Sequence, residues 1–160
     1  MERGATLVEL VITIVIISVA IAGVVGAFAL ISGRSANPLN ETRAVALAQL
    51  YMDEIITQKY DDQTPPGGVP RYTRSCSIGP EGGETRATFD DVDDYDGLND
   101  SPPASAVSGV SGYDGFSVLV DVLCAGGEVG LPVSQAKRID LTISVPGNQQ
   151  FVFSAYRANF

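Results

Sequence analysis

The chain has 160 residues and a formal net charge of −9, from 19 acidic and 10 basic side chains. This charge makes nucleic acid or anionic lipid an unfavourable partner for any part of the chain outside a membrane. We therefore expect that this chain alone binds no nucleic acid. The chain contains no histidine, which excludes a histidine-based catalytic triad and any metal site that needs histidine ligands.

A long apolar run begins near the N-terminus. Between Thr6 and Ser32, the only ionisable side chain is that of Glu9. At about 1.5 Å per helical residue this run reaches roughly 40 Å, which is enough to cross a bilayer. It is also too long for the apolar part of a cleavable secretory signal. The run predicts a membrane-spanning helix that stays with the mature protein.

The carboxylate of Glu9 is the anomaly of this run. An unpaired charge inside a membrane costs roughly 2.5 kcal/mol or more, and such a residue usually serves a function. Glu9 follows a glycine, Gly4, at a spacing of five residues. A signal anchor of the ordinary kind would account for the apolar run but not for this glycine and glutamate. We expect Glu9 to have a partner that lipid does not supply.

The start of the chain, Gly4-Ala5-Thr6-Leu7-Val8-Glu9-Leu10, resembles the N-terminus of type IV pilin precursors. In that family a prepilin peptidase cuts after the glycine and N-methylates the new first residue. The resemblance implies cleavage between Gly4 and Ala5, methylation of Ala5, and a role in assembly for Glu9. Ala5 stands where the family usually has phenylalanine, and the leader 1–4 is less basic than usual. Both departures bear on the efficiency of processing.

The resemblance also implies a location and partners. Residues 5–33 would be a transmembrane and polymerisation helix in the inner membrane, with the N-terminus cytoplasmic before processing. Residues 34–160 would form one globular domain in the periplasm and then in an extracellular fibre, and their number suits a single domain. The partners would be the prepilin peptidase, the inner-membrane assembly platform, and other major and minor pilins bound through the N-terminal helix.

The helix is expected to change character at Pro38, because proline lacks an amide hydrogen and disfavours helical backbone at Asn37. We expect a kink or a restart there, followed by an amphipathic helix over about 38–60 that packs on a sheet. Its expected apolar face consists of Ala44, Val45, Ala48, Tyr51, Met52, Ile55 and Ile56.

Residues 79–112 are expected to form an acidic, loop-rich region whose only basic side chain is Arg86. Crowded carboxylates repel one another unless a cation answers them, and carboxylate oxygens suit calcium. The spacing does not fit an EF-hand loop. A solvated acidic loop that needs no cofactor is the alternative. The candidate calcium ligands are Asp90, Asp91, Asp93, Asp94 and Asp96.

The two cysteines, Cys76 and Cys124, both follow the membrane segment. An oxidising periplasm would allow them to pair. We expect a disulfide that closes a loop of about 49 residues and contributes roughly 4 kcal/mol on the chain-entropy estimate. Two buried thiols are the alternative.

Strands are predicted by an apolar alternation of period two within about 113–156. The alternating positions are Phe116, Val118, Val120 and Val122, then Ile139, Leu141, Ile143 and Val145, then Phe151, Phe153 and Ala155. A turn at 146–149 joins the last two strands, and a further strand is expected at 71–78. The expected fold is α+β and pilin-like, with a long N-terminal helix packed on a short antiparallel sheet.

Enzymatic activity is not expected. The stretch Ser134-Gln135-Ala136-Lys137 fits the Ser-x-x-Lys motif of penicillin-binding enzymes. Neither of the two companion motifs of those enzymes occurs, and the chain has no glycine-rich phosphate loop.

Three further stretches, 47–55, 89–97 and 156–160, narrow the resemblance to D-type minor pilins of the mannose-sensitive haemagglutinin (MSHA) pilus system. A minor pilin of that class would prime or cap a fibre, or lie within it. A minor pseudopilin of a type II secretion system shares the leader, stem and sheet and is the first alternative. A signal-anchored periplasmic binding module is the alternative of another class.

Overall fold

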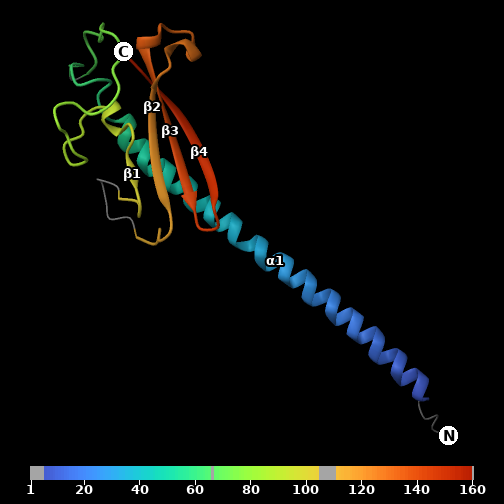
Figure 1. Cartoon of the computed structure of the whole chain (residues 1–160). Coiled ribbons are helices and arrows are strands. Elements are labelled where there is room, and N and C mark those ends of the chain that lie inside the picture. The colour runs from blue at the N-terminus through green and yellow to red at the C-terminus, as the bar shows by residue number, and fades with distance from the viewer. Residues whose placement is uncertain (1–5, 66, 105–110, 160) are drawn as a thin grey trace. The chain divides into compact units, whose positions relative to one another are not determined.

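The computed structural model describes residues 6–65, 67–104 and 111–159, and residues 32–37 by their backbone alone. It has a long N-terminal helix and a four-stranded antiparallel sheet (Figure 1), so the predicted α+β class is confirmed. The chain divides into two compact units with the boundary between Asn40 and Glu41. The first unit holds the N-terminal part of the helix, and the second holds the rest of the helix and the sheet.

Helix α1 runs from Leu7 to Ile56 and contains Pro38. The restart expected at this proline is therefore wrong. A proline removes one backbone hydrogen bond at a cost of about 3 kcal/mol, while the helix that follows is rich in alanine and is held by packing. The helix ends at Ile56, before the expected residue 60, and Lys59 pairs with the acidic loop. The Lys59 amide donates to the Asp90 carbonyl oxygen at 3.4 Å, and the Val92 amide donates to the Lys59 carbonyl oxygen at 3.1 Å.

The sheet is a meander in the order β1-β2-β3-β4, with every neighbouring pair antiparallel. Its strands are β1 (Asn99–Asp100), β2 (Ser117–Cys124), β3 (Ala136–Val145) and β4 (Gln149–Ala158). In the described part of the chain, three short 3₁₀ helices accompany it: η1 (Asp93–Tyr95), η2 (Gly126–Val129) and η3 (Val133–Gln135). The three alternating segments predicted as strands are β2, β3 and β4.

The strand expected at 71–78 is wrong, because this stretch is irregular. Its backbone bonds to a side chain where a strand would bond to another strand. The Tyr72 amide donates to Asn159 Oδ1 at 3.2 Å, and Asn159 Nδ2 donates to the Tyr72 carbonyl oxygen at 2.7 Å. Strand β1 was not predicted, since two polar residues carry no alternating pattern.

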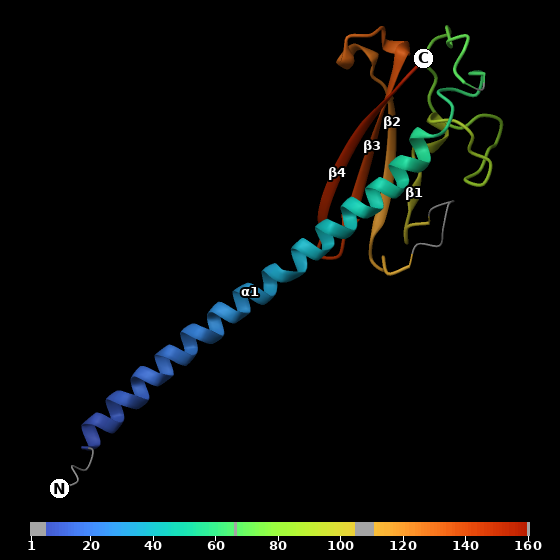
Figure 2. The same cartoon turned by 180° about the vertical axis from the view of Figure 1, so that it is seen from behind.

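The core of the second unit lies between α1 and one face of the sheet (Figure 2). The buried helix positions are Ala44, Leu47, Ala48, Tyr51 and Ile55, and the buried strand positions include Val118, Val120, Val122, Ile139, Leu141, Ile143 and Val145. The helix face is rotated from the predicted one: Leu47 is fully buried, whereas Val45 and Ile56 are 39% and 37% exposed.

Candidate functional site

The first candidate site is the apolar part of α1. Leu7–Ile31 is long and apolar enough to cross a membrane, and none of it is buried. Its hydroxyl groups are satisfied within the helix, since Thr13 Oγ1 donates to the Glu9 carbonyl oxygen at 2.6 Å and Ser18 Oγ donates to the Ile14 carbonyl oxygen at 2.8 Å. An exposed apolar surface of this size requires an apolar environment, so this segment is a candidate single-pass membrane anchor. A signal sequence passes the same test of length and composition.

Thr6 caps the start of this helix. Its Oγ1 accepts a hydrogen bond from the Glu9 amide at 3.3 Å, and Thr6-Leu7-Val8-Glu9 has the spacing of a capping box. This signal is present in the sequence and was missed there. It gives Glu9 a local role as well, because an acidic side chain in the first turn is favourable beside the positive end of the helix dipole.

Among the described residues, no basic side chain forms an ion pair with the Glu9 carboxylate. Capping therefore explains the position of Glu9 at the helix start but supplies no counter-charge. Gly4 and Ala5, the predicted cleavage and methylation positions, lie outside the described residues. Their role stays a prediction.

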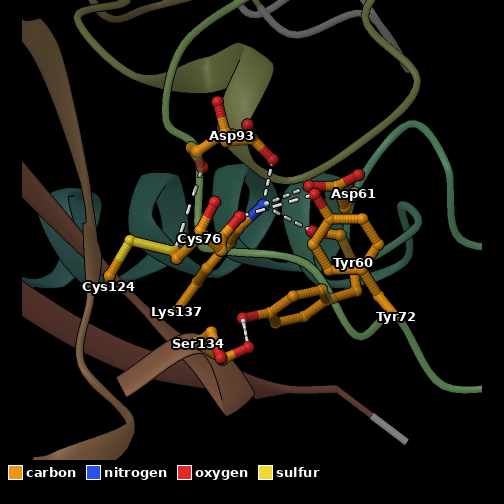
Figure 3. Close-up of a disulfide and its surroundings, with 10 residues drawn as sticks. Tyr60, Asp61, Tyr72, Cys76, Asp93, Cys124, Ser134 and Lys137 are labelled. Carbon is orange, nitrogen blue, oxygen red and sulfur yellow. Dashed lines mark hydrogen bonds and ion pairs between the residues drawn. A yellow bond between two sulfur atoms is a disulfide. The ribbon is translucent and has the colours of Figure 1, made fainter.

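The second candidate site surrounds the disulfide. Cys76 and Cys124 are bonded, with 6.1 Å between their Cα atoms (Figure 3). The predicted disulfide is confirmed. It fastens the irregular stretch 71–78 to the end of β2, where no backbone ladder holds that stretch.

A buried ion pair lies beside the disulfide (Figure 3). Lys137 is fully buried on β3, and its ammonium contacts the Asp93 carboxylate. The same Nζ donates to the Tyr60 carbonyl oxygen at 2.7 Å and lies 3.9 Å from Asp61 Oδ2. Burial raises the pKa of Asp93, and the bond from Lys137 opposes that rise. Through these contacts the buried charge pair connects the segment after the helix, the acidic loop and the sheet.

This environment also bears on the Ser-x-x-Lys stretch. Ser134 lies in η3 and Lys137 in β3. Lys137 Nζ points to the buried carboxylates of Asp93 and Asp61, and Ser134 contributes its backbone oxygen, which accepts a hydrogen bond from the Tyr60 hydroxyl at 3.0 Å. Within the described residues, the contacts of Lys137 therefore do not include the serine hydroxyl that such a nucleophile pair requires.

The third candidate site is the acidic loop, whose five predicted ligands are split by the structure. Asp93 pairs with Lys137. Asp96 holds β2, because its Oδ1 accepts from the Val122 amide at 2.8 Å. Asp90, Asp91 and Asp94 do gather, in two groups that share Asp94 and that are completed by the unpredicted residues Glu81 and Glu84.

In the first group, one carboxylate oxygen from each of Glu81, Asp91 and Asp94 lies within 4.8 Å of the other two. In the second, the same holds for Glu84, Asp90 and Asp94. Glu81 and Glu84 were visible in the sequence as acidic residues, but they were not predicted as ligands. They lie several residues before Asp91, and no pattern in the sequence indicated that the loop folds back to bring them close to it.

No protein-family model, curated protein or solved structure matches this chain.

Proposed function

We propose that the chain is a minor pilin of an MSHA-type type IV pilus, made as a precursor, cut after Gly4 and built into a fibre or used to prime one. The observation that carries this proposal is the combination at the N-terminus. An apolar helix, Leu7–Ile31, is exposed along its whole length, and one carboxylate, Glu9, stands in its first turn. The preceding glycine completes the pattern of a prepilin leader.

The proposed mechanism is mechanical. The apolar helix Leu7–Ile31, here called the stem, would first lie in the inner membrane, where lipid covers its apolar side chains. It would then be drawn sideways into a bundle of like stems. The bundle offers the same apolar surroundings, so the transfer needs no change of fold. The second unit supports this, because its core consists of residues from Ala44 onward and needs no contribution from the stem.

Within the bundle the Glu9 carboxylate needs a cation. Cleavage after Gly4 would create one, the amino group of Ala5, in the same chain or in a neighbour. Two opposite charges removed from water remain tolerable only when they are paired. Pairing with a neighbour would also set the axial register of adjacent stems.

The test is processing of the full-length chain in membranes with and without a prepilin peptidase. We expect the peptidase to remove residues 1–4 and to leave a methylated Ala5, as read by mass spectrometry of the N-terminal peptide. A Gly4→Leu variant, whose stem is otherwise identical, should stay uncut. An N-terminal peptide that still begins at Met1 in the presence of the peptidase would favour a signal-anchored module and contradict the proposal.

A further inference from the structure

In the acidic loop, Asp91 and Asp94 each use only one of their two carboxylate oxygens as a hydrogen-bond acceptor. Asp91 Oδ1 accepts hydrogen bonds from the amides of Asp93 at 2.8 Å and of Asp94 at 3.2 Å. In return, Asp94 Oδ2 accepts from the amides of Asp90 at 2.8 Å and of Asp91 at 3.1 Å. These bonds fix both side chains at the turn into η1. Each aspartate is left with a second oxygen.

Those second oxygens are buried and without a hydrogen-bond partner. Asp91 and Asp94 are 0% and 1% exposed, and Asp91 Oδ2 and Asp94 Oδ1 accept no hydrogen bond. Glu81 Oε2 is shielded from solvent and unpartnered as well. Leaving a buried polar group unsatisfied is destabilising, and more so when the group is charged. Because these three residues also bring one carboxylate oxygen each to within 4.8 Å of the others, the unpartnered oxygens indicate a missing partner.

The missing partner is not a basic side chain of the described part of the chain. Arg86 pairs with Glu54, Lys59 with Asp90, and Lys137 with Asp93 and Asp61. None of the ion pairs in residues 6–65, 67–104 and 111–159 includes Glu81, Asp91 or Asp94. Each of these three basic side chains already has an acidic partner elsewhere.

We propose that Glu81, Asp91 and Asp94 form a divalent cation site, with Glu84 at its outer edge, and that its occupant is calcium. One carboxylate oxygen from each of the three inner residues lies within 4.8 Å of the other two, and one oxygen of Glu84 lies within 4.8 Å of an oxygen of Asp94. A single divalent ion bridges oxygens at such separations and neutralises two of their charges.

The chemistry of the donors selects the ion. All of them are carboxylate oxygens, the chain has no histidine, and both cysteines are in the disulfide. Soft and borderline metals are therefore disfavoured. Calcium accepts an irregular set of oxygens completed by water, whereas magnesium demands a near-ideal octahedron and gives up its water reluctantly. An irregular loop of this kind suits calcium better.

A bound ion would join two parts of the acidic loop, the turn at Glu81 and the turn at Asp91 and Asp94. The second turn is already tied to the sheet through Asp93 and Lys137. The ion would thus extend a rigid connection from β3 outward to the loop surface. This inference concerns the second unit only and does not depend on the proposed role in a pilus.

The experiment is a set of thermal melts of the full-length chain in detergent, in EGTA, in magnesium chloride and in calcium chloride at equal ionic strength. We expect calcium alone to raise Tm, by about 4 °C or more at concentrations well above Kd, because an ion that binds only the folded chain stabilises it. Isothermal titration with calcium chloride should give one ion per chain. Equal curves in magnesium and calcium, or no binding in the titration, would overturn the site.

Two variants locate the ion. Asp94→Asn keeps an oxygen for the backbone amides and removes the charge, and Glu81→Gln leaves the bonds of the Asp91 and Asp94 turn untouched. Both should lose the calcium-specific shift. Asp114→Asn removes one charge from an exposed position and should keep it. If Asp94→Asn fails to fold, Glu81→Gln decides: a calcium shift of wild-type size in that variant would refute the assignment.

Discussion

Lys137 shows how much of this structure depends on single charged residues. Its side chain is fully buried and its ammonium contacts Asp93, which is also fully buried. Removing one partner of such a pair leaves the other charge unanswered in the interior. We expect Lys137→Met to lower the free energy of unfolding by about 3 kcal/mol, as measured by urea denaturation.

The matched control for this variant adds Asp93→Asn to Lys137→Met. The double variant has no buried unpaired charge and should regain part of the lost stability. Equal stability of the wild type and Lys137→Met would contradict the buried ion pair.

Glu84 gives a prediction of pH dependence. Its contact with Asp94 is the main cause that raises its pKa to about 7, with Asp90 adding to the rise. Burial raises the pKa of Asp91 too, and the charge of Asp94 contributes. A carboxyl whose pKa is higher in the folded chain than in the unfolded chain binds its proton more tightly when folded. Its contribution to stability is therefore complete at low pH and is lost as pH rises through the folded value.

In EGTA we expect Tm of the full-length chain to fall as pH rises from about 5 to about 8. Calcium should reduce this fall, since the ion takes the place of the proton. Glu84→Gln should flatten the profile in EGTA. A Tm that is constant or rises over this range in EGTA would show that these carboxylates are not crowded in the folded chain.

For the acidic loop, the sequence indicated which residues carry carboxylates but not which groups those carboxylates contact. Five aspartates close together suggested one set of ligands. In the folded chain Asp93 turns to Lys137 and Asp96 to the amide of Val122, while Glu81 joins from another turn. Which carboxylate meets which cation is decided by tertiary contacts, and no local pattern records them.

Among the elements, the strands with a clear alternation were predicted well. In β2 and β3 every second side chain is buried, at the positions expected. Successive side chains of a strand point to opposite faces of the sheet, so a strand that is buried on one face has an apolar residue at every second position. This pattern can be read directly from the sequence. The strand predicted at 71–78 was wrong because the backbone of Tyr72 forms its hydrogen bonds with the side chain of Asn159. Asn159 lies far away in the sequence, so no local pattern indicated this contact.

The helix teaches a similar lesson. A kink or a restart was expected at Pro38, and the restart is wrong because α1 continues through the proline. Its buried face was placed nearly correctly from a period of 3.6 residues, but Leu47 was omitted and two exposed residues, Val45 and Ile56, were included. A helical face is wide, and only the neighbouring sheet decides where its edges fall.

The disulfide holds an element that has no ladder of its own. We expect reduction of the bond between Cys76 and Cys124 to lower the stability of the second unit by roughly 4 kcal/mol on the chain-entropy estimate. The measurement is a thermal melt with and without reductant, with a Cys76→Ser and Cys124→Ser double variant as the control that reductant should not affect. Ready alkylation of both thiols in native, unreduced protein would contradict the bond.

For the whole molecule, the stem and the second unit differ in how their apolar side chains are covered. The stem, Leu7–Ile31, is exposed and apolar, whereas the second unit has a closed core of its own. The proposed transfer of the stem from lipid to a bundle of helices would rely on this difference, because the core of the second unit consists of its own residues.

Glu9→Val tests the proposed role of Glu9 in assembly. Removing the charge leaves the cleavage position Gly4 untouched, so we expect processing to continue. Incorporation into fibres should fall strongly, because the amino group of Ala5 then has no counter-charge in an apolar bundle. The matched control is Glu41→Val, which removes an exposed carboxylate elsewhere on the same helix. Normal incorporation of Glu9→Val, measured by immunoblot of sheared fibres, would remove Glu9 from the assembly mechanism.

The most direct measurement of the central claim is mass spectrometry of the N-terminal peptide of this chain, taken from fibres sheared off cells that express it at native level. A minor pilin predicts a peptide that begins at Ala5 and carries one methyl group, in a fibre fraction free of inner membrane. A peptide that still begins at Met1, or a chain found in the membrane and absent from the fibres, would contradict it.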